Sequence, residues 1–222
     1  MEKWISPSRA ASMIRTGDTV MVGGFGLVGT PLTMIQELES TDVHDLTIIS
    51  NNLGDQNKGL GKLLADGKVK KAIGSYFTGN PDVGAFYHAQ RLQVELIPQG
   101  SLSEAIRAGG AGIGGFLTKT AVGTALAEGK TIIEMDGEEY LLQKALRADV
   151  AIIRAHKADT LGNLTYYKTA RNFNPMMATA AKLVIAEVDE IVEAGELDPE
   201  QIITPHLFVD YIVRAEVKIG GE

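Results

Sequence analysis

Gly23-Gly24-Phe25-Gly26-Leu27-Val28-Gly29-Thr30-Pro31 is the stretch of this sequence that decides the fold. It follows an apolar run rich in β-branched residues, Thr19–Val22, and precedes apolar residues at helical spacing over Leu32–Leu38. A glycine-rich loop therefore joins a strand to a helix, for which Thr30 is the expected N-cap and Pro31 the first residue. Such a loop lets backbone approach a ligand and presents free N–H groups to an anion or a polarised oxygen. The residues expected to bind that ligand are Gly23, Gly24, Phe25, Gly26, Leu27, Val28, Gly29 and Thr30.

The same glycines match the dinucleotide-binding pattern G-x-G-x-x-G at Gly24, Gly26 and Gly29. That pattern also needs an acidic residue about 20 positions on, at the end of the second strand, for the ribose hydroxyl. The expected second strand, Leu46–Ile49, is followed instead by Ser50-Asn51-Asn52. Nicotinamide binding is therefore disfavoured, and a tight turn without a ligand stays open as the simplest alternative.

Short apolar strands alternate with helical segments along the chain, which is typical of an α/β fold with a mostly parallel sheet flanked by helices. The expected strands are Thr19–Val22, Leu46–Ile49, Lys71–Tyr76, Val94–Ile97, Val150–Arg154, Leu183–Val188 and Tyr211–Val213. The expected helices are Pro7–Ile14, capped by Ser6, then Pro31–Glu39, Gly59–Ala65, Val83–Gln90, Leu102–Arg107 and Asn174–Ala181.

One segment, about residues 109–145, does not follow this alternation of strands and helices. Five glycines lie between Gly109 and Gly115, and Asp136-Gly137 stands between two extended runs within Thr131–Leu141. Asp-Gly in that setting predicts a type I′ hairpin turn. We therefore expect a small antiparallel insertion within a single domain that spans residues 1–222.

Loops that follow parallel strands gather at one edge of the sheet, where active sites of such folds lie. Gln99 follows a strand and precedes Gly100, so its amide is expected to face this crevice and to donate to a developing oxyanion. An amide that only caps the helix at Leu102 is the alternative. Asn51 and Asn52 either bind a ligand carbonyl or form a turn.

Composition excludes several classes of protein. The 222 residues carry a formal net charge of -7, which argues against a nucleic-acid surface. Cysteine is absent, so thiolate chemistry and zinc–sulfur sites are excluded, and the four histidines show no metal-ligand spacing. With no apolar run near the ~20 residues that span a membrane, and no apolar signal core at the start, we expect a cytoplasmic protein.

Four ordered motifs together run from about Asp18 to Arg214. They are Asp18–Phe25 with Gly29-x-Pro31; Pro98–Leu102 with Glu104 and Ile106–Gly112; Lys157-Ala158-Asp159 with Gly162-Asn163; and Ala170–Asn174. These motifs resemble those of the family I coenzyme A transferases, and the chain is most similar to α subunits of bacterial acetate/butyrate–acetoacetate transferases.

The resemblance implies a ping-pong transfer of coenzyme A between a short-chain acyl-CoA and acetoacetate, with coenzyme A as a substrate and no resident metal or cofactor. It places Gln99 beside the reacting carbonyl, the glycine loop against the thioester, and Asn51, Asn52 and Gly100 in the substrate pocket. A valine at Gly24 is then expected to block the ligand and leave assembly intact.

The family's nucleophile is a glutamate in a Glu-x-Gly-type motif, which this sequence lacks; Glu104, Glu134 and Glu138 do not match it. The resemblance therefore implies a β subunit that carries the nucleophile, in an α2β2 heterotetramer. A transferase for another acid, of propionate or glutaconate type, and a non-catalytic or isomerase module on the same sheet are the alternatives. The roles of Arg107, Asp159, Arg171 and Asn172 stay open, between structural, interfacial and anion-binding.

Overall fold

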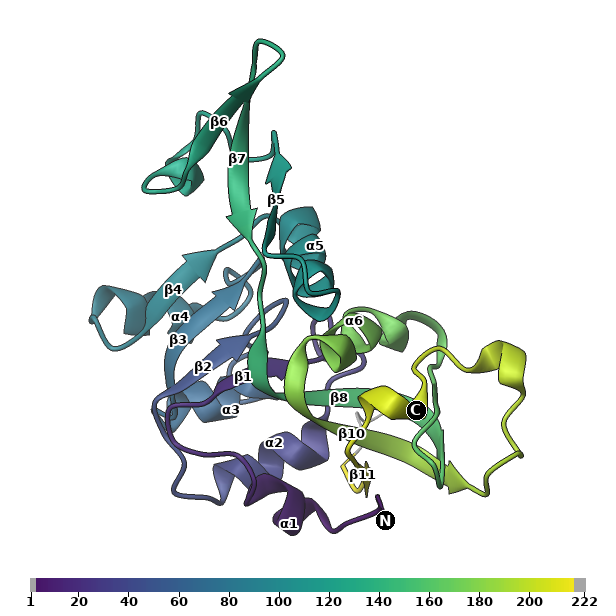
Figure 1. Cartoon of the computed structure of the whole chain (residues 1–222). Coiled ribbons are helices and arrows are strands. Elements are labelled where there is room, and N and C mark those ends of the chain that lie inside the picture. The colour runs from purple at the N-terminus through teal and green to yellow at the C-terminus, as the bar shows by residue number, and fades with distance from the viewer. Residues whose placement is uncertain (1–2, 218–222) are drawn as a thin grey trace.

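The computed structural model describes residues 3–217, and its main element is a sheet of eight strands (Figure 1). Seven strands follow the order β11-β10-β8-β1-β2-β3-β4, and all neighbours along this path are parallel. The eighth, β9, pairs antiparallel with β8. The strands are β1 (Thr19–Val22), β2 (Leu46–Ile49), β3 (Val69–Gly74), β4 (Gln93–Leu96), β8 (Ala148–Asp159), β9 (Leu164–Thr165), β10 (Ala181–Val192) and β11 (Tyr211–Arg214).

Helices cover both faces of this sheet, as the alternating pattern predicts. On β1, Val20 and Val22 pack on the face that carries α1–α4, whereas Met21 packs on the opposite face with α5 and α6. Side chains alternate between faces with a period of two, so a fully apolar strand must be buried on both sides. The helices are α1 (Pro7–Ala11), α2 (Leu32–Glu39), α3 (Leu60–Ala65), α4 (Pro81–His88), α5 (Gln99–Gly110) and α6 (Asn174–Thr179).

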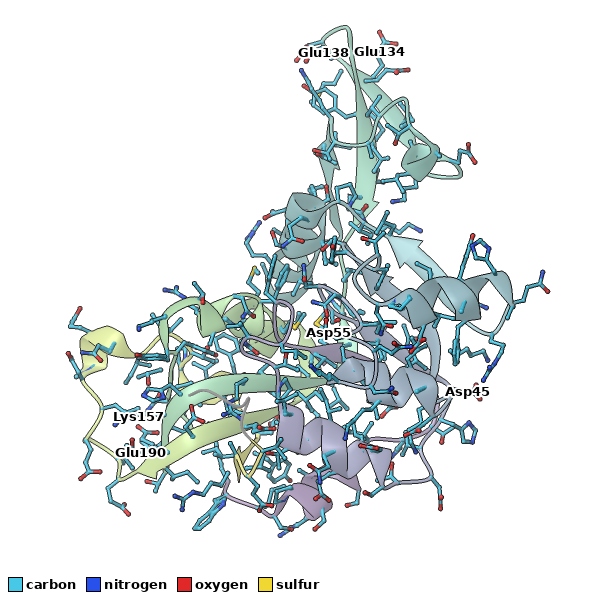
Figure 2. All side chains as sticks on the ribbon, turned by 180° about the vertical axis from the view of Figure 1, so that it is seen from behind. Asp45, Asp55, Glu134, Glu138, Lys157 and Glu190 are labelled. Atoms are coloured by element: carbon cyan, nitrogen blue, oxygen red, sulfur yellow. The ribbon has the colours of Figure 1, made fainter. Side chains whose placement is uncertain are left out.

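A three-stranded antiparallel sheet projects from the body of the molecule (Figure 1). Its strands are β5 (Gly115–Thr118), β6 (Ile132–Met135) and β7 (Glu138–Lys144), in the order β5-β7-β6. Asp136 and Gly137 have φ of 55° and 76°, as the predicted type I′ turn requires. Glu134 and Glu138 lie at the far end of this projection (Figure 2).

Several predicted boundaries are wrong. β3 ends at Gly74 rather than Tyr76, and α5 begins at Gln99 rather than Leu102. Strands β8 and β10 are twelve residues each, because they pair with one another well beyond the apolar segments Val150–Arg154 and Leu183–Val188. The sequence pattern also missed β5, β9 and four 3₁₀ turns: Ala125–Ala127, Lys168–Arg171, Pro199–Gln201 and His206–Phe208.

Candidate active site

The glycine loop forms a tight hairpin directly after β1. Phe25 and Val28 exchange backbone hydrogen bonds of 3.0 and 3.2 Å, and Gly26 turns the chain with φ of 61°. Phe25 is 54% exposed at the tip. The expectation that the loop offers free N–H groups holds only in part, since Gly23 and Gly24 are also bonded internally. Within residues 3–217, no acceptor is found for the N–H groups of Gly26, Leu27 and Gly29.

Two asparagines of the motif Ala170–Asn174 hold this hairpin in place. Asn172 Oδ1 accepts from the Gly24 N–H at 3.1 Å, and its Nδ2 donates to the Val28 carbonyl at 3.0 Å. Asn174, fully buried, donates from Nδ2 to the Gly29 carbonyl at 3.0 Å. The role of Asn172, which the sequence left open, is therefore to shape the loop.

Close packing explains why glycine occupies the first two positions of the loop. A Cβ atom at Gly23 would lie 1.7 Å from Asn174 Oδ1, and one at Gly24 would lie 2.2 Å from Thr30 Oγ1. Gly24 also has φ of 124°, which β-branched residues resist. A valine at Gly24 would therefore displace Thr30 and deform the loop, so the expectation that it blocks the ligand has a second explanation and this variant does not separate the two.

The prediction that Thr30 caps the following helix is also wrong. Thr30 Oγ1 donates to the Gly26 carbonyl at 3.2 Å, and α2 begins two residues later. The helix N-terminus is satisfied instead by Glu187 of β10, whose Oε2 accepts from the Met34 N–H at 3.0 Å. A carboxylate suits the positive end of the helix dipole.

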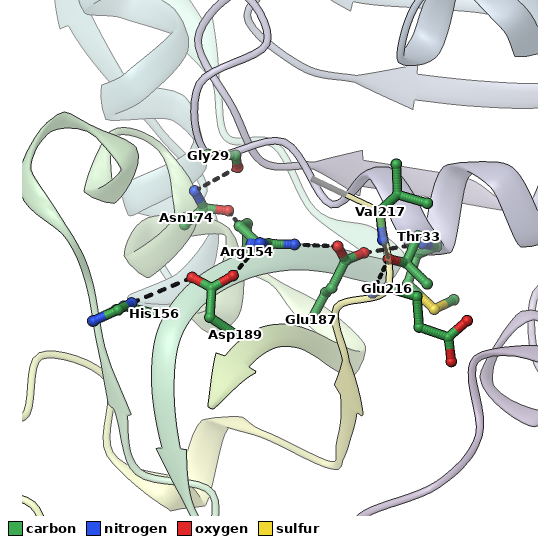
Figure 3. Close-up of polar contacts among 10 residues, drawn as sticks. Gly29, Thr33, Arg154, His156, Asn174, Glu187, Asp189, Glu216 and Val217 are labelled. Atoms are coloured by element: carbon green, nitrogen blue, oxygen red, sulfur yellow. Dashed lines mark hydrogen bonds and ion pairs between the residues drawn. The ribbon is translucent and has the colours of Figure 1, made fainter. Parts of the chain in front are cut away.

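Glu187 is completely buried and forms an ion pair with Arg154, which also pairs with Asp189 (Figure 3). Burial raises the pKa of the Glu187 carboxyl, while the Arg154 charge and the Met34 N–H oppose that rise. The Arg154 backbone N–H donates to Asn174 Oδ1 at 2.8 Å. One polar network therefore joins β8, β10, α2 and the asparagine that holds the glycine loop.

The ends of the neighbouring strands bring Asn51, Asn52 and Gln99 together. Asn51 Nδ2 donates to Gln99 Oε1 at 2.8 Å, and Asn52 Nδ2 donates to Asn51 Oδ1 at 2.9 Å. Ser75, which sequence reasoning missed, also donates to Gln99 Oε1. Gln99 therefore does not act as a helix-capping amide. A small depression lies between Asn52 and the glycine loop; it is lined by Gly23, Gly24, Gly26, Leu27, Thr30, Ser50, Asn52, Gly54 and Leu60.

Gln99 is the first residue of α5, and both it and Gly100 are exposed. The residue before the helix, Pro98, supplies no side-chain cap. Among the described residues, none accepts a hydrogen bond from Gln99 Nε2 or from the N–H groups of Gln99 and Gly100. This end of the site therefore presents a cluster of donors, which suits an oxygen that gains negative charge.

Three residues with open roles lie outside this cluster. Arg107 forms an exposed pair with Glu104 of its own helix, and that hydrogen bond lowers the pKa of the glutamate. Asp159 is buried, and its Oδ1 accepts from three consecutive N–H groups at residues 161–163. Arg171 makes no ion pair within residues 3–217, so its role stays open.

In the part of the chain that the structure describes, no group of three or more His, Asp or Glu residues is placed to hold a metal ion. None of the helices there is long and apolar enough to cross a membrane.

Comparison with known proteins assigns the chain to a class. The family described as coenzyme A transferase matches residues 5–215, so the chain belongs to the coenzyme A transferase family and is an enzyme of that class. It is 51% identical to one subunit of a probable succinyl-CoA:3-ketoacid coenzyme A transferase of Bacillus subtilis, over 96% of this chain and 90% of that one. It is 48% identical to the alpha subunit of the acetate CoA-transferase of Escherichia coli, over 92% and 93% of the two chains.

A solved structure supports the same fold. The chain superposes with a TM-score of 0.87 on an acyl-CoA transferase, YdiF, from E. coli O157:H7 in a thioester complex with CoA. The match covers 98% of this chain and 48% of that one at 23% identity, so this chain spans about half of that transferase. The predicted fold class is confirmed.

Proposed function

We propose that the chain is the α subunit of a 3-oxoacid CoA-transferase, which moves coenzyme A between a short-chain acyl-CoA, such as acetyl-CoA or butyryl-CoA, and acetoacetate. The observation that carries the proposal is the free Nε2 of Gln99 beside the uncapped start of α5. These donors lie where the parallel strands end, and hydrogen bonds through Asn51 connect Gln99 to Asn52, which lines the same depression as the glycine loop. Such donors lower the barrier of acyl transfer because they meet charge that develops in the transition state.

The ion pairs of the glutamates in this chain support a nucleophile that comes from another polypeptide. Four glutamates that could be considered as nucleophiles are engaged in ion pairs, and a fifth, Glu134, stands on the projecting sheet (Figure 2). The pairs are Glu104–Arg107, Glu138–Lys119, Glu187–Arg154 and Glu190–Lys157. We therefore infer that a partner β subunit contributes the catalytic glutamate, as the names of the relatives, each a single subunit of its enzyme, also suggest.

The proposed reaction consists of two half-reactions, and the first of them has two steps. The partner's glutamate attacks the acyl carbonyl, which releases the coenzyme A thiolate and leaves a mixed anhydride. The thiolate then attacks the glutamyl carbonyl, which releases the first acid and leaves a glutamyl thioester. A second acid reverses both steps. Gln99 Nε2 donates to the oxyanion of the tetrahedral intermediates, so this chain supplies stabilisation rather than the reacting carboxylate.

The identity of the carboxylic acid that exchanges coenzyme A is the most specific part of the proposal. One relative is named for succinyl-CoA and a 3-ketoacid and the other for acetate, at nearly equal identity. Acetoacetate with a short acyl-CoA is our first assignment, and a related transferase for another acid is the alternative. Initial rates of the assembled enzyme with acetate, butyrate, propionate, succinate and glutaconate would separate the two.

Borohydride trapping tests where the covalent intermediate forms. When the assembled enzyme is given acyl-CoA and then borohydride, we expect the reduced glutamate to lie on the partner chain, because borohydride converts an enzyme thioester to an alcohol. Peptide mass mapping identifies the site, and a sample treated without acyl-CoA is the control. A reduced glutamate at Glu104, Glu134, Glu138, Glu187 or Glu190 would contradict the assignment of this chain as the α subunit.

Gly100→Ala tests whether a ligand approaches the start of α5. A Cβ atom at Gly100 meets no other atom within 4 Å, and alanine favours a helix by up to about 1 kcal/mol, so stability should be kept or raised. We expect kcat/KM for acyl-CoA to fall about tenfold, equivalent to ~1.4 kcal/mol of crowding against the substrate.

Gly84→Ala is the matched control, since Gly84 is an exposed glycine of α4 whose added Cβ also meets no atom within 4 Å. This variant should gain stability without loss of activity. Full activity in Gly100→Ala would remove Gly100 from the substrate pocket.

A further inference from the structure

A chain of three side-chain amides connects a backbone N–H to Gln99. The Gly54 N–H donates to Asn52 Oδ1 at 2.7 Å. Asn52 Nδ2 donates to Asn51 Oδ1 at 2.9 Å, and Asn51 Nδ2 donates to Gln99 Oε1 at 2.8 Å. Each amide therefore accepts on one side and donates on the other, and the last donor in the series is Gln99 Nε2.

The direction of this series of hydrogen bonds is fixed by the Gly54 N–H, where the series begins. A backbone N–H can only donate, so the atom of Asn52 that faces Gly54 must be the carbonyl oxygen. The amino group of Asn52 then faces Asn51, whose oxygen must turn toward it, and the same logic orients Gln99. If any one amide reversed, two donors or two acceptors would face each other.

Ser75 and burial reinforce the arrangement. The Ser75 hydroxyl accepts from Asn51 Nδ2 at 3.0 Å and donates to Gln99 Oε1, which agrees with the same direction. Asn51 is only 2% exposed, so water competes little with these bonds. Both amino hydrogens of Asn51 are used within the protein, which leaves Gln99 as the group of the pair that can reach a ligand. Hydrogen bonds in such a chain also polarise one another.

We propose that Asn52 is a positioning residue that sets the donor direction of Gln99 through Asn51. The inference rests on the proposed function, since the reacting carbonyl beside Gln99 belongs to it. A glutamine amide presents either an amino group or an oxygen after a half-turn about its last bond, at little intrinsic cost. An oxygen facing the developing oxyanion would repel it, whereas the amino group stabilises it. The amide chain selects the amino group.

Asn52→Asp should reverse the direction of these hydrogen bonds with almost no change in the shape of the side chain. The carboxylate still accepts from the Gly54 N–H, but it cannot donate to Asn51. The amide of Asn51 is then best satisfied by turning over, and its oxygen forces Gln99 to turn as well. We expect kcat of the assembled enzyme to fall about 10²-fold, with a smaller change in KM and an unchanged melting temperature.

Asn57→Asp is the matched control, because Asn57 is exposed in the same loop region and the substitution adds the same charge. It should leave kcat within about twofold of the wild-type value. A comparable loss in this control would assign the effect of Asn52→Asp to charge alone and would overturn the inference.

The double variant with Gln99→Ala separates positioning from direct binding. If Asn52 acts through Gln99, adding Asn52→Asp to Gln99→Ala should lower kcat by no more than about twofold further. Losses that multiply would mean that Asn52 acts independently, and would overturn the inference. So would a normal kcat in Asn52→Asp while Gln99→Ala is impaired. An unimpaired Gln99→Ala would instead overturn the proposed role of Gln99 itself.

Ser75→Ala gives a second measurement if Asn52→Asp does not assemble. It removes one of the two donors to Gln99 Oε1 without adding a charge. We expect kcat to fall about tenfold, and this fall to vanish when Gln99 is already alanine. A fall of the same size in both backgrounds would overturn the amide chain as the cause.

Discussion

Gln99→Ala in the assembled enzyme is expected to lower kcat by about 10²–10³-fold and to change KM much less. The structure leaves Gln99 Nε2 free of acceptors among the described residues, while Asn51 and Ser75 hold its Oε1. A donor held in that way acts mainly when the carbonyl oxygen becomes an oxyanion, so its loss raises the barrier rather than the dissociation constant. Single-turnover rates of thioester formation would measure the effect directly.

Two further variants sharpen this prediction. Gln99→Glu keeps the size of the side chain and its acceptor for Asn51 but loses the amino group, so it should be as impaired as Gln99→Ala. Gln93→Ala, which changes an exposed glutamine on β4, is the control and should have a normal rate. A normal kcat in Gln99→Ala would refute a role for the amide in transfer.

Local sequence patterns predicted the parallel strands and the helices, although not all of their boundaries, and indicated the edge of the sheet where the candidate site lies. The continuous apolar run of β1 between a turn and a glycine loop indicated a strand buried on both faces, and Val20 and Met21 do pack on opposite sides. Because loops that follow parallel strands meet at one edge of the sheet, the same pattern indicated that Gln99 lies near Asn51, and the two are hydrogen-bonded. The type I′ turn at Asp136-Gly137 likewise followed from local backbone chemistry.

Contacts between distant segments could not be predicted in this way. Ser75 was missed because β3 was extended past Gly74, which made a loop residue look like part of a strand. At α4, in contrast, local residues mark the start of the helix, since Asn80 caps it and Pro81 is its first residue rather than Val83. By contrast, no pattern near Thr30 reveals that the cap of α2 comes from Glu187, 153 residues away from Met34.

The buried ion pair between Arg154 and Glu187 gives the second large prediction, this time for stability. Arg154→Met removes the cation but leaves Glu187, which is 0% exposed, with its hydrogen bond from the Met34 N–H. We expect the free energy of unfolding at neutral pH to fall by about 3–5 kcal/mol, since an uncompensated buried charge remains. Urea denaturation monitored by circular dichroism would measure the change as a lower midpoint at constant slope.

The dependence on pH identifies Glu187 as the cause. Burial already raises the pKa of this carboxyl in the folded protein, and loss of Arg154 removes the main opposing charge, so the pKa rises further. Stability linked to a raised folded-state pKa is fully present below the unfolded value, about 4, and is lost as the pH rises through the folded value. The deficit of Arg154→Met relative to wild type should therefore shrink as the medium is acidified.

A second substitution tests the same explanation at constant pH. Adding Glu187→Gln to Arg154→Met keeps an acceptor for the Met34 N–H but removes the buried charge, so most of the lost stability should return. Lys157→Met is the matched control, because Lys157 pairs with Glu190 across the same two strands on the exposed surface (Figure 2) and should cost far less. If the double variant is as unstable as Arg154→Met alone, the loss of stability comes from the packing of the Arg154 side chain and not from the unpaired, buried carboxylate of Glu187.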